Sequence, residues 1–376
     1  MQPKMWLSSP HMGGTEQDFV NEAFETNWVA PLGPNVDGFE KDIASFLGNN
    51  VHVAALTSGT AAIHLALVQA GVTQGDVVLC QSFTFSASAN PIVYQGAMPV
   101  FIDSEATTWN MDPNYLEDAI QHYIAKGQKP KAVIVVHLYG MPANMQAITA
   151  LAAKYEITLI EDAAEALGSS LHGQPMGTFS QYGVLSFNGN KIITTSGGGA
   201  LVSASAETIA TTKFLATQAR DAAPHYQHSH IGFNYRMSNI SAGIGRGQMQ
   251  VLPQRVQQRR ANHAFYQRHL STLPCISFLE EPTGYYSNRW LTTILCSQAA
   301  NTPDRESIRL QLDAQNIESR PLWKPMHLQP VFQNAPYFGG NVAEQLFANG
   351  LCLPSGSNLT TADLDRVIGI IKNLYQ

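Results

Sequence analysis

One feature of this sequence constrains its fold more than any other: a strand, a helix and a second strand follow one another between residues 131 and 162. The first segment is KAVIVVHLYG (131–140), a continuous β-rich run. Helical apolar spacing follows in ANMQAITALAAKYE (143–156), and ITLIED (157–162) is again strand-like. Continuous apolar runs are typical of parallel strands buried on both faces, and the three segments form a βαβ unit. Because this alternation recurs from about residue 50 to 200, the sequence predicts an α/β domain with a mostly parallel sheet.

The pattern of predicted helices and strands changes after about residue 240. The stretch MQVLPQRVQQRRANHAFYQRHL (249–270) predicts a long, exposed basic helix that could link two domains. Short strand-like runs and two helical stretches follow it. We therefore expect a large domain over residues 1–245, with an N-terminal segment that could pack on the smaller domain, and a small α+β domain over residues 246–376. A chain of 376 residues with 44% apolar content is long enough for both.

Composition and charge argue against several classes of protein. The net charge is −6 and only 13% of the residues are charged, which argues against nucleic-acid binding and attraction to anionic membranes. No run approaches the roughly 18 apolar residues that span a bilayer, and the N-terminus lacks the apolar core of a signal peptide. Four distant cysteines without a CxxC pair predict reduced thiols and a cytoplasmic location. Scattered histidines without an HExxH motif predict no metal site.

The first stretch that could carry chemistry is TSGTAAIHLALVQAG (57–71), in which small residues lead into an Ala/Leu-rich helix. Ligands of open parallel sheets bind outside the carboxyl ends of the strands. A helix that starts there offers free backbone N–H groups and a positive dipole end to a phosphate. The same stretch could also be an ordinary helix start that Ser58 or Thr60 caps.

Two further stretches place ionisable side chains at strand ends. IEDAAEALGS (160–169) ends a buried strand with Glu161 and Asp162. Because burying an unpaired charge is costly, these carboxylates either cap a helix or pair with a cation, which could be a ligand atom. SFNGNKIITTSGGGA (186–200) holds Lys191 among small polar residues. That lysine is either a solvated loop residue or a Schiff-base nucleophile, since its amine can attack a carbonyl.

The combination of the three stretches is more specific than any one of them. A phosphate-holding helix start, a strand-end Asp and a lysine 29 positions after it (191 − 162) fit pyridoxal 5′-phosphate, PLP. The phosphate of PLP needs N–H and hydroxyl donors, its pyridine nitrogen needs a carboxylate, and its aldehyde needs a lysine. The βαβ pattern alone would also allow a dinucleotide oxidoreductase, but the sequence lacks the GxGxxG fingerprint of that class.

The whole chain resembles the DegT/DnrJ/EryC1/StrS family of PLP-dependent nucleotide-sugar aminotransferases. The motifs that carry the resemblance are LSSPHMGG, TSGTAAIHLAL, SFTFSASAN, HLYGMPANM, IEDAAEALGS, SFNGNKIITTSGGG, GFNYRMSNISAGIG and LCLPSG. The resemblance implies the aspartate aminotransferase fold (fold type I). That fold has a large domain with a mainly parallel seven-stranded sheet and a small α+β C-terminal domain, and it forms a homodimer.

Within the family, the sequence looks most like the pgl-type UDP-4-keto-6-deoxy-GlcNAc C4 aminotransferases. The signals are the lysine loop together with TQARD, SNRWLTT and ESRPLWKPMH. This implies transfer of the amino group of L-glutamate to C4 of UDP-2-acetamido-2,6-dideoxy-α-D-xylo-hexos-4-ulose. The products would be 2-oxoglutarate and UDP-4-amino-4,6-dideoxy-N-acetyl-α-D-glucosamine, for bacillosamine-type glycans, with pyridoxamine phosphate (PMP) as the cofactor's intermediate form. Many relatives have His in place of Asn188 and an acidic residue near Ser196, and this departure leaves PLP chemistry untouched.

The resemblance also implies a role for each matching residue around the cofactor ring. Lys191 matches the Schiff-base lysine, and Asp162 matches the carboxylate that faces the pyridine nitrogen. Glu165, where many relatives have Gln, should approach the phenolic oxygen O3′ of the cofactor. Phe85 matches the aromatic residue that stacks on the pyridine ring.

Other matches concern the phosphate and the substrate. Gly59, Thr60 and Ser186 match phosphate contacts. Asn234 matches a residue that reaches the phosphate from the other subunit, so each active site would need both chains of a dimer. The expected substrate-pocket residues are Arg320, Trp323 and His327, although Trp323 could simply pack a turn and His327 could be an ordinary hydrogen-bonded histidine. Arg236 and Asn239 are open between a structural and a functional role.

Three alternative functions stay open at this point. The same chemistry could act on a dTDP- or GDP-linked 4-keto-6-deoxyhexose, or on a C3 ketone. A dehydratase on the same fold is a second alternative, although the members that work as 3-dehydratases carry His in place of the lysine. The third is a non-catalytic regulatory member, against which the intact Lys191 and Asp162 argue.

Overall fold

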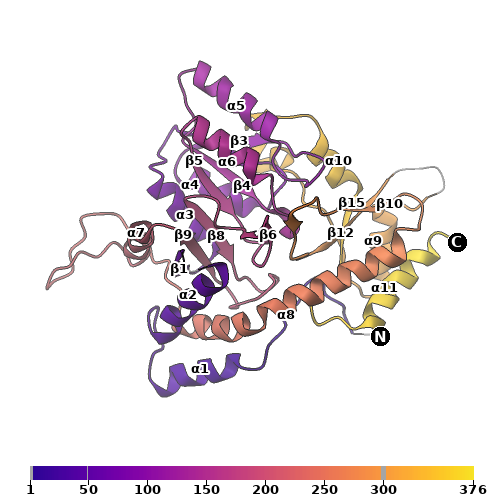
Figure 1. The fold of residues 1–376 in the computed structure, drawn as a ribbon, viewed down its shortest axis with the longest axis horizontal. Helices are drawn as coiled ribbons and strands as arrows, with labels where there is room; N and C mark the ends of the chain where they lie inside the picture. Colours follow the sequence, from indigo (N-terminus) through magenta and orange to yellow (C-terminus); the bar gives the residue numbers. More distant parts are fainter. Residues whose placement is uncertain (1–2, 49, 298–301) are drawn as a thin grey trace.

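An eight-stranded sheet forms the centre of the computed structural model, which describes residues 3–48, 50–297 and 302–376 (Figure 1). The strand order is β1-β9-β8-β5-β4-β2-β3-β14, and all neighbours run parallel except at β9, which is antiparallel to β1 and β8. The strands are β1 (His52–Leu56), β2 (Val77–Gln81), β3 (Met98–Ile102), β4 (Ala132–Val136), β5 (Thr158–Asp162), β8 (Tyr182–Ser186), β9 (Gly199–Ser203) and β14 (Tyr337–Phe338).

The predicted βαβ unit is present as β4, helix α6 (Met145–Lys154) and β5, and its two strands pair side by side in parallel. The α/β fold with a mainly parallel sheet is therefore confirmed. The sheet has one strand more than the expected seven, because β14 comes from the C-terminal part of the chain and adds to the edge at β3. A two-residue strand carries too weak a periodic signal to be seen in the sequence.

Helices cover both faces of the sheet, and this explains the continuous apolar runs. In β4, Val133 and Val135 pack into one core with α2, α5 and α6, whereas Ala132 and Ile134 pack into a second core with α3, α4 and α7. Successive side chains of a strand point to opposite faces, so both sets must be apolar. The covering helices are α2 (Pro34–Leu47), α3 (Gly59–Gln69), α4 (Asn90–Tyr94), α5 (Pro113–Ala125) and α7 (Ala206–Ala216).

A third core lies in the C-terminal part of the chain, around a four-stranded antiparallel sheet in the order β10-β12-β15-β13. Helices α9 and α11 and the end of α8 supply its other side chains. The elements are β10 (Ile276–Phe278), β12 (Thr292–Cys296), β13 (Arg320–Pro321), β15 (Gly350–Leu353), α9 (Arg305–Ala314), α10 (Val342–Asn349) and α11 (Thr361–Asn373). A small three-stranded sheet consists of β6 (Ser170–Leu171), β7 (Gln174–Pro175) and β11 (Tyr285–Tyr286).

The long basic helix predicted at 249–270 is part of α8 (Asn239–Leu270), which runs along the molecule from α1 (Glu16–Glu25) and α2 to α11 (Figure 1). The expectation that this helix is exposed holds for one face, which includes Gln254, Gln257 and Arg268, and is wrong for the other. Arg255 and Arg259 are 4% and 1% exposed, and backbone carbonyls from distant segments accept their N–H groups. The boundary expected at residues 245/246 falls inside α8, and that division into domains stays a prediction.

The N-terminal segment lies across the C-terminal part of the chain. Met5 forms a bridge with Ile317, and the backbone carbonyl of Leu7 accepts the N–H of Ser355 at 2.8 Å. Figure 1 shows the first described residues of the chain close to α11. In the described residues no helix is long and apolar enough to cross a membrane.

Candidate active site

A cavity of about 390 Å³ opens at the carboxyl ends of β4, β5 and β8. Eight of the predicted site residues line it: Gly59, Thr60, Phe85, Asp162, Glu165, Ser186, Lys191 and Trp323. They come from positions up to 264 apart in sequence (323 − 59). The fold therefore brings together the helix start, the strand-end carboxylate and the lysine loop, as the parallel sheet predicts.

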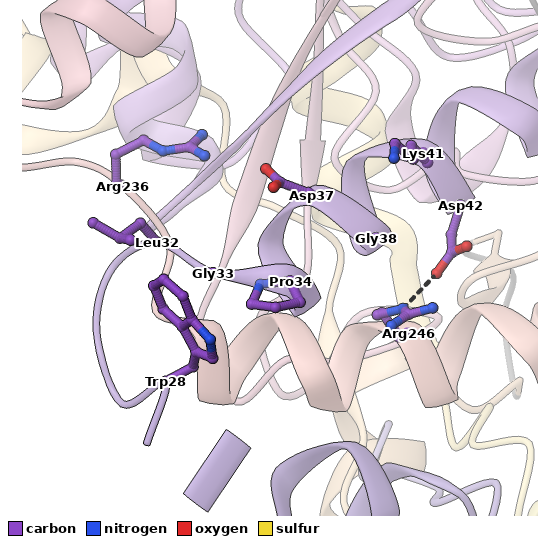
Figure 2. A pocket seen from close by; sticks show the side chains of 10 residues that line it. All are labelled: Trp28, Leu32, Gly33, Pro34, Asp37, Gly38, Lys41, Asp42, Arg236 and Arg246. Atoms are coloured by element: carbon purple, nitrogen blue, oxygen red, sulfur yellow. Dashed lines mark hydrogen bonds and ion pairs between the residues drawn. The ribbon is translucent and has the colours of Figure 1, made fainter. Parts of the chain in front are cut away.

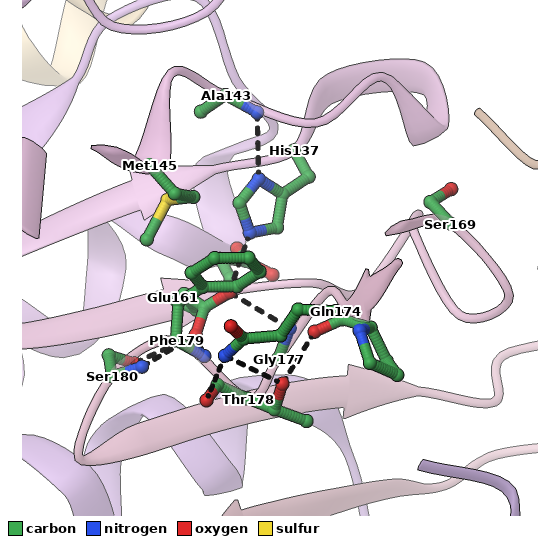
Figure 3. A network of polar contacts seen from close by, with 12 residues as sticks. His137, Ala143, Met145, Glu161, Ser169, Gln174, Gly177, Thr178, Phe179 and Ser180 are labelled. Carbon is green, nitrogen blue, oxygen red and sulfur yellow. Dashed lines mark hydrogen bonds and ion pairs between the residues drawn. The ribbon is translucent and has the colours of Figure 1, made fainter. Parts of the chain in front are cut away.

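The two carboxylates that end β5 point to opposite faces of the sheet, and only Asp162 reaches the cavity. Glu161 is fully buried on the other face (Figure 3). It accepts the backbone N–H groups of Gly177 and Phe179 at 2.9 and 2.7 Å and lies 3.0 Å from Nε2 of His137. Since Nδ1 of His137 accepts the N–H of Ala143, Nε2 carries the proton and donates to Glu161. Glu161 is therefore a structural residue.

Asp162 is held in place by two donors. The hydroxyl of Ser88 donates to its Oδ2 at 2.6 Å, and the backbone N–H of Ala164 donates to its Oδ1 at 3.2 Å. Ser88 in turn lies 2.8 Å from the hydroxyl of Thr84. The carboxylate is 5% exposed and has no cationic partner among the described residues, so it can serve a cationic group that enters the cavity.

Lys191 and Glu165 form a buried pair in the cavity, 3.4 Å apart between Nζ and Oε1. Their side chains are 13% and 5% exposed. Burial raises the pKa of Glu165, against the opposing effect of the Lys191 charge. The Nζ of Lys191 also lies 4.4 Å from the centre of the Trp290 ring, where the amine contacts an aromatic face. The lysine is therefore not a solvated loop residue.

The start of α3 forms one wall of the cavity. Ser58 caps the helix by accepting the N–H of Ala61 at 3.0 Å, and the first helical N–H groups, of Gly59 and Thr60, have no preceding turn to bond to. The hydroxyl-bearing Ser186, the last residue of β8, lies in the same wall. A Cβ at Gly199 would stand 2.3 Å from the backbone N of Gly59, so only glycine lets the strand and the helix start approach this closely.

Aromatic rings form the opposite side of the cavity. Trp323 has its ring centre 6.2 Å from that of Phe85, 6.5 Å from that of Trp290 and 5.6 Å from that of Tyr139. The backbone N–H of Trp323 also donates to the Tyr139 hydroxyl at 2.9 Å. Trp323 thus packs a turn and lines the cavity at once. Phe85 is 58% exposed and free to receive a flat ring on its face.

Three predicted residues lie outside this cavity. Asn234 is exposed and forms a bridge with Thr217, at the base of the segment 218–233, which extends away from the sheet (Figure 1). Arg320 is on β13, with its exposed side chain paired to Glu318 at 2.7 Å. His327 lies 2.7 Å from the Ser82 hydroxyl and 3.2 Å from Glu344, and it stacks on Tyr337, so its ring nitrogens are already engaged.

A second, open cavity of about 660 Å³ lies between α2 and the start of α8 (Figure 2). It is rimmed by Arg236 and by Arg246, which pairs with Asp42 at 3.3 Å. Arg236 also donates to Glu40 at 2.8 Å and to the Ala55 carbonyl. Nearby, Oδ1 of Asn239 accepts two backbone N–H groups at the start of α2. Arg236 and Asn239 therefore have structural roles.

The sequence matches the model of the DegT/DnrJ/EryC1/StrS aminotransferase family over residues 10–372. The chain belongs to this family. EpsN of Bacillus subtilis (strain 168), which is named as a pyridoxal phosphate-dependent aminotransferase, is 51% identical over 100% of this chain and 97% of its own. The GDP-perosamine synthase of Caulobacter vibrioides is 35% identical over 98% of each chain.

Solved structures share the whole fold of this aminotransferase. The PMP form of the sugar aminotransferase Spr1654 from Streptococcus pneumoniae superposes with a TM-score of 0.91 at 25% identity, over 99% of this chain and 98% of its own. Like other members of the family, the aminotransferase uses PLP, as predicted. The cavity fits this cofactor chemically, because it offers an amine, a fixed carboxylate free of a counter-ion, and a helix start with hydroxyl neighbours.

Several residues of the site were not predicted from the sequence. Trp290, Ser88 and Asn190 line the cavity of this aminotransferase, although their motifs SNRWLTT, SFTFSASAN and SFNGNKIITTSGGG had been singled out. Ser88 could have been found, because it lies in the same motif as Phe85. The place of Trp290 beside Lys191 depends on a contact across 99 positions (290 − 191), for which no local pattern exists.

Proposed function

We propose that this aminotransferase transfers the amino group of L-glutamate to C4 of UDP-2-acetamido-2,6-dideoxy-α-D-xylo-hexos-4-ulose. The product is UDP-4-amino-4,6-dideoxy-N-acetyl-α-D-glucosamine, for bacillosamine-type glycans. The observation that carries the chemistry is the single cavity that holds both Lys191 and Asp162. The UDP-linked substrate rests on the resemblance in the lysine loop and in the segment ESRPLWKPMH.

In this proposal Lys191 would hold PLP through the cofactor's aldehyde, and its free amine would act as the base that moves a proton. PLP supplies an electron sink for the C–H bond that breaks. The amine of Lys191 suits this task because its pair with Glu165 and the Trp290 ring restrict it to one side of the cavity. The same lysine amine would serve both half-reactions, with L-glutamate and with the sugar ketone.

Asp162 would hold the pyridine nitrogen of PLP in its protonated form. Its two donors, Ser88 and the Ala164 N–H, fix the carboxylate before the cofactor arrives, so it need not reorganise during the reaction. Glu165 would lie at O3′ of the cofactor. Burial raises its pKa, and the Lys191 charge opposes that rise.

The N–H groups of Gly59 and Thr60 and the Ser186 hydroxyl would hold the phosphate, and Phe85 would contact the cofactor ring. Asn234 completes the phosphate site from the partner subunit of a homodimer. Its exposed position outside its own cavity is compatible with such a contact in trans. The apolar side chains of Trp28 and Leu32 beside the second cavity, 40% and 55% exposed, could be covered by the same partner (Figure 2).

The sugar nucleotide enters along the aromatic side of the cavity, where Trp323 contacts it. Arg320 and His327 lie outside the cavity of a single chain, so a role for either in substrate binding requires a movement of the segment 320–327 or a second subunit. The proposal therefore assigns substrate contact to Trp323 before Arg320 or His327.

The test is a coupled assay with purified protein, PLP and ¹⁵N-labelled L-glutamate. The UDP-4-keto-6-deoxy-GlcNAc substrate is made in place by a 4,6-dehydratase, and the product is identified by mass and NMR. We expect a ¹⁵N amine on C4 of the UDP-sugar, and no multiple turnover from the Lys191→Ala variant. Normal turnover by that variant would contradict the proposed chemistry.

A GDP-linked 4-keto-6-deoxyhexose is the second candidate substrate. The relative that supports it is the GDP-perosamine synthase that shares 35% identity over nearly the whole chain. Assaying the GDP-, dTDP- and UDP-linked ketosugars side by side separates these options. An amine formed only on the GDP-sugar would keep the aminotransferase chemistry and replace the proposed substrate. No amine on any ketosugar, without conversion of PLP to PMP by glutamate, would favour a regulatory member.

A further inference from the structure

Arg259, on α8, is a buried cation without a carboxylate partner among the described residues. Its side chain is 1% exposed, and no carboxylate of the described chain lies within ion-pair distance. One of its nitrogens, Nε, has no hydrogen-bond partner there. Burial, and then the nearby Arg255 charge, lower the pKa of Arg259 to about 9. Burying a guanidinium in this way costs free energy, and such a residue calls for an explanation beyond packing.

The hydrogen bonds of Arg259 lead to the residue before the catalytic lysine. Its Nη2 donates to the Ser8 hydroxyl at 2.9 Å, and its Nη1 donates to the Trp290 carbonyl at 2.5 Å. Ser8 then donates to the backbone carbonyl of Asn190 at 2.7 Å, and the indole N–H of Trp290 donates to the same carbonyl at 2.8 Å. Two donors thus converge on Asn190, and Arg259 contacts both residues that supply them.

We propose that Arg259 and Ser8 are positioning residues for Lys191. They fix the Asn190 carbonyl, and with it the start of the peptide that carries the lysine. Arg259 also donates to the Trp290 carbonyl, and the ring of Trp290 confines the lysine amine. The proposal rests on the proposed role of Lys191 in bonding to PLP.

The surroundings of Lys191 show why such an anchor is needed. The lysine lies in a loop of small polar residues between β8 and β9, outside any helix or strand. Its backbone N–H bonds only locally, to the Asn188 carbonyl at 2.9 Å. A hydrogen bond from a charged donor is stronger than one between neutral groups. Arg259 donates to the oxygen of the Ser8 hydroxyl, which makes that hydroxyl a stronger donor. The buried charge of Arg259 therefore strengthens the hydrogen bond from Ser8 to the Asn190 carbonyl.

Arg255, one turn earlier on α8, provides a matched comparison. It is also buried, at 4%, and also has an Nε without a partner among the described residues. Its Nη2 donates to the carbonyls of His11 and Met12, so it fastens the N-terminal segment without reaching Asn190. If Arg259 only held the N-terminal segment in place, substitutions of Arg255 and Arg259 would have the same effect on the bonding of PLP.

The experiment compares covalent and non-covalent binding of the cofactor. Binding of PMP, which forms no bond to Lys191, is measured by quenching of tryptophan fluorescence. Bonding of PLP to Lys191 is followed by its visible absorbance and by borohydride trapping with peptide mass spectrometry. For Ser8→Ala and Arg259→Lys we expect the rate constant for bonding of PLP to Lys191 to fall about 5- to 10-fold. A decrease of this size corresponds to the free energy of one lost hydrogen bond. The Kd of PMP should change less than about 2-fold, because the phosphate and ring sites stay intact.

Two control variants complete the design. Ser9→Ala removes a hydroxyl that contacts Asn358 at 3.3 Å, and Arg255→Lys shortens the neighbouring buried cation. Both should bond PLP at the wild-type rate. Equal rates for Ser8→Ala and wild type would overturn the inference, as would parallel losses of PLP bonding and PMP affinity, which indicate general damage.

The design also separates this inference from the proposed function. A wild-type protein that binds PMP but never bonds PLP at Lys191 would contradict the proposed role of the lysine itself. Should Arg259→Lys fail to fold, Ser8→Ala and Trp290→Phe, which removes the second donor to Asn190 and keeps a ring, test the same anchor.

Discussion

At the scale of single residues, two neighbouring carboxylates have different roles in the structure. Glu161 and Asp162 both end a buried strand, and both were open between a structural and a functional role. Strand geometry sends Glu161 toward a loop whose N–H groups satisfy it completely, and sends Asp162 into the cavity, where no cation of the described chain meets it. A buried carboxylate is therefore informative only once its partners are known.

His263 gives a residue-scale prediction about pH. It is buried on α8, and neither ring nitrogen has a partner among the described residues. Burial, and then the Arg289 and Arg260 charges, lower the pKa of His263 to about 3. Since the unfolded chain takes up a proton first as the pH falls, this residue should remove about 2–3 kcal/mol of stability between pH 7 and 4.5.

The measurement for His263 is urea unfolding across that pH range. The His263→Leu variant should lose less stability on acidification than wild type, whereas His225→Gln, on an exposed segment, should follow the wild-type curve. An identical pH dependence of His263→Leu and wild type would show that His263 takes up its proton in the folded protein as well.

At the scale of elements, the three glycines that end the lysine loop are not equivalent. A Cβ on Gly199 would lie 2.3 Å from the Gly59 backbone N and from the Ser58 backbone C, and backbone cannot move aside as a side chain can. A Cβ on Gly197 would meet nothing within 4 Å. We expect Gly199→Ala to lower the free energy of unfolding by about 2–3 kcal/mol, and Gly197→Ala to change it by less than about 0.5 kcal/mol.

Urea unfolding at neutral pH, without cofactor, tests this pair of substitutions. The comparison is well matched, since both variants add the same methyl group within three residues. If Gly199→Ala unfolds at the wild-type urea concentration, β9 and the start of α3 can separate freely, and their close approach at the wall of the cavity is not a constraint on the fold.

At the scale of the whole molecule, the proposed homodimer leads to a prediction that needs two different chains to test. If Asn234 acts in the partner's site, a heterodimer of one Lys191→Ala chain and one Asn234→Ala chain has one site with both substitutions and one with neither. Two different affinity tags allow such a heterodimer to be purified after co-expression. It should show about half the wild-type activity, although each homodimeric variant is nearly inactive.

A different activity of the heterodimer would contradict the prediction. If Asn234 served its own chain, each site of the heterodimer would carry one substitution, and the activity would stay at the level of the two parents. A light-scattering mass measured alongside shows whether a dimer forms at all, so an absent dimer is not mistaken for an inactive one.

The sequence by itself determined the family, the βαβ core, PLP as cofactor and the motifs that supply Lys191 and Asp162. The family followed from the resemblance of its motifs, whereas the βαβ core and the strand-end and loop positions of Asp162 and Lys191 depend on short-range geometry, which residues close together in the chain set. Only the tertiary structure decided which groups surround the lysine. Ser8 and Arg259 are 251 positions apart, and Asn190 and Trp290 are 100 apart. Contacts over such distances leave no periodic pattern, so the basic helix α8 looked exposed, although its Arg255 and Arg259 are buried and donate to carbonyls of other segments.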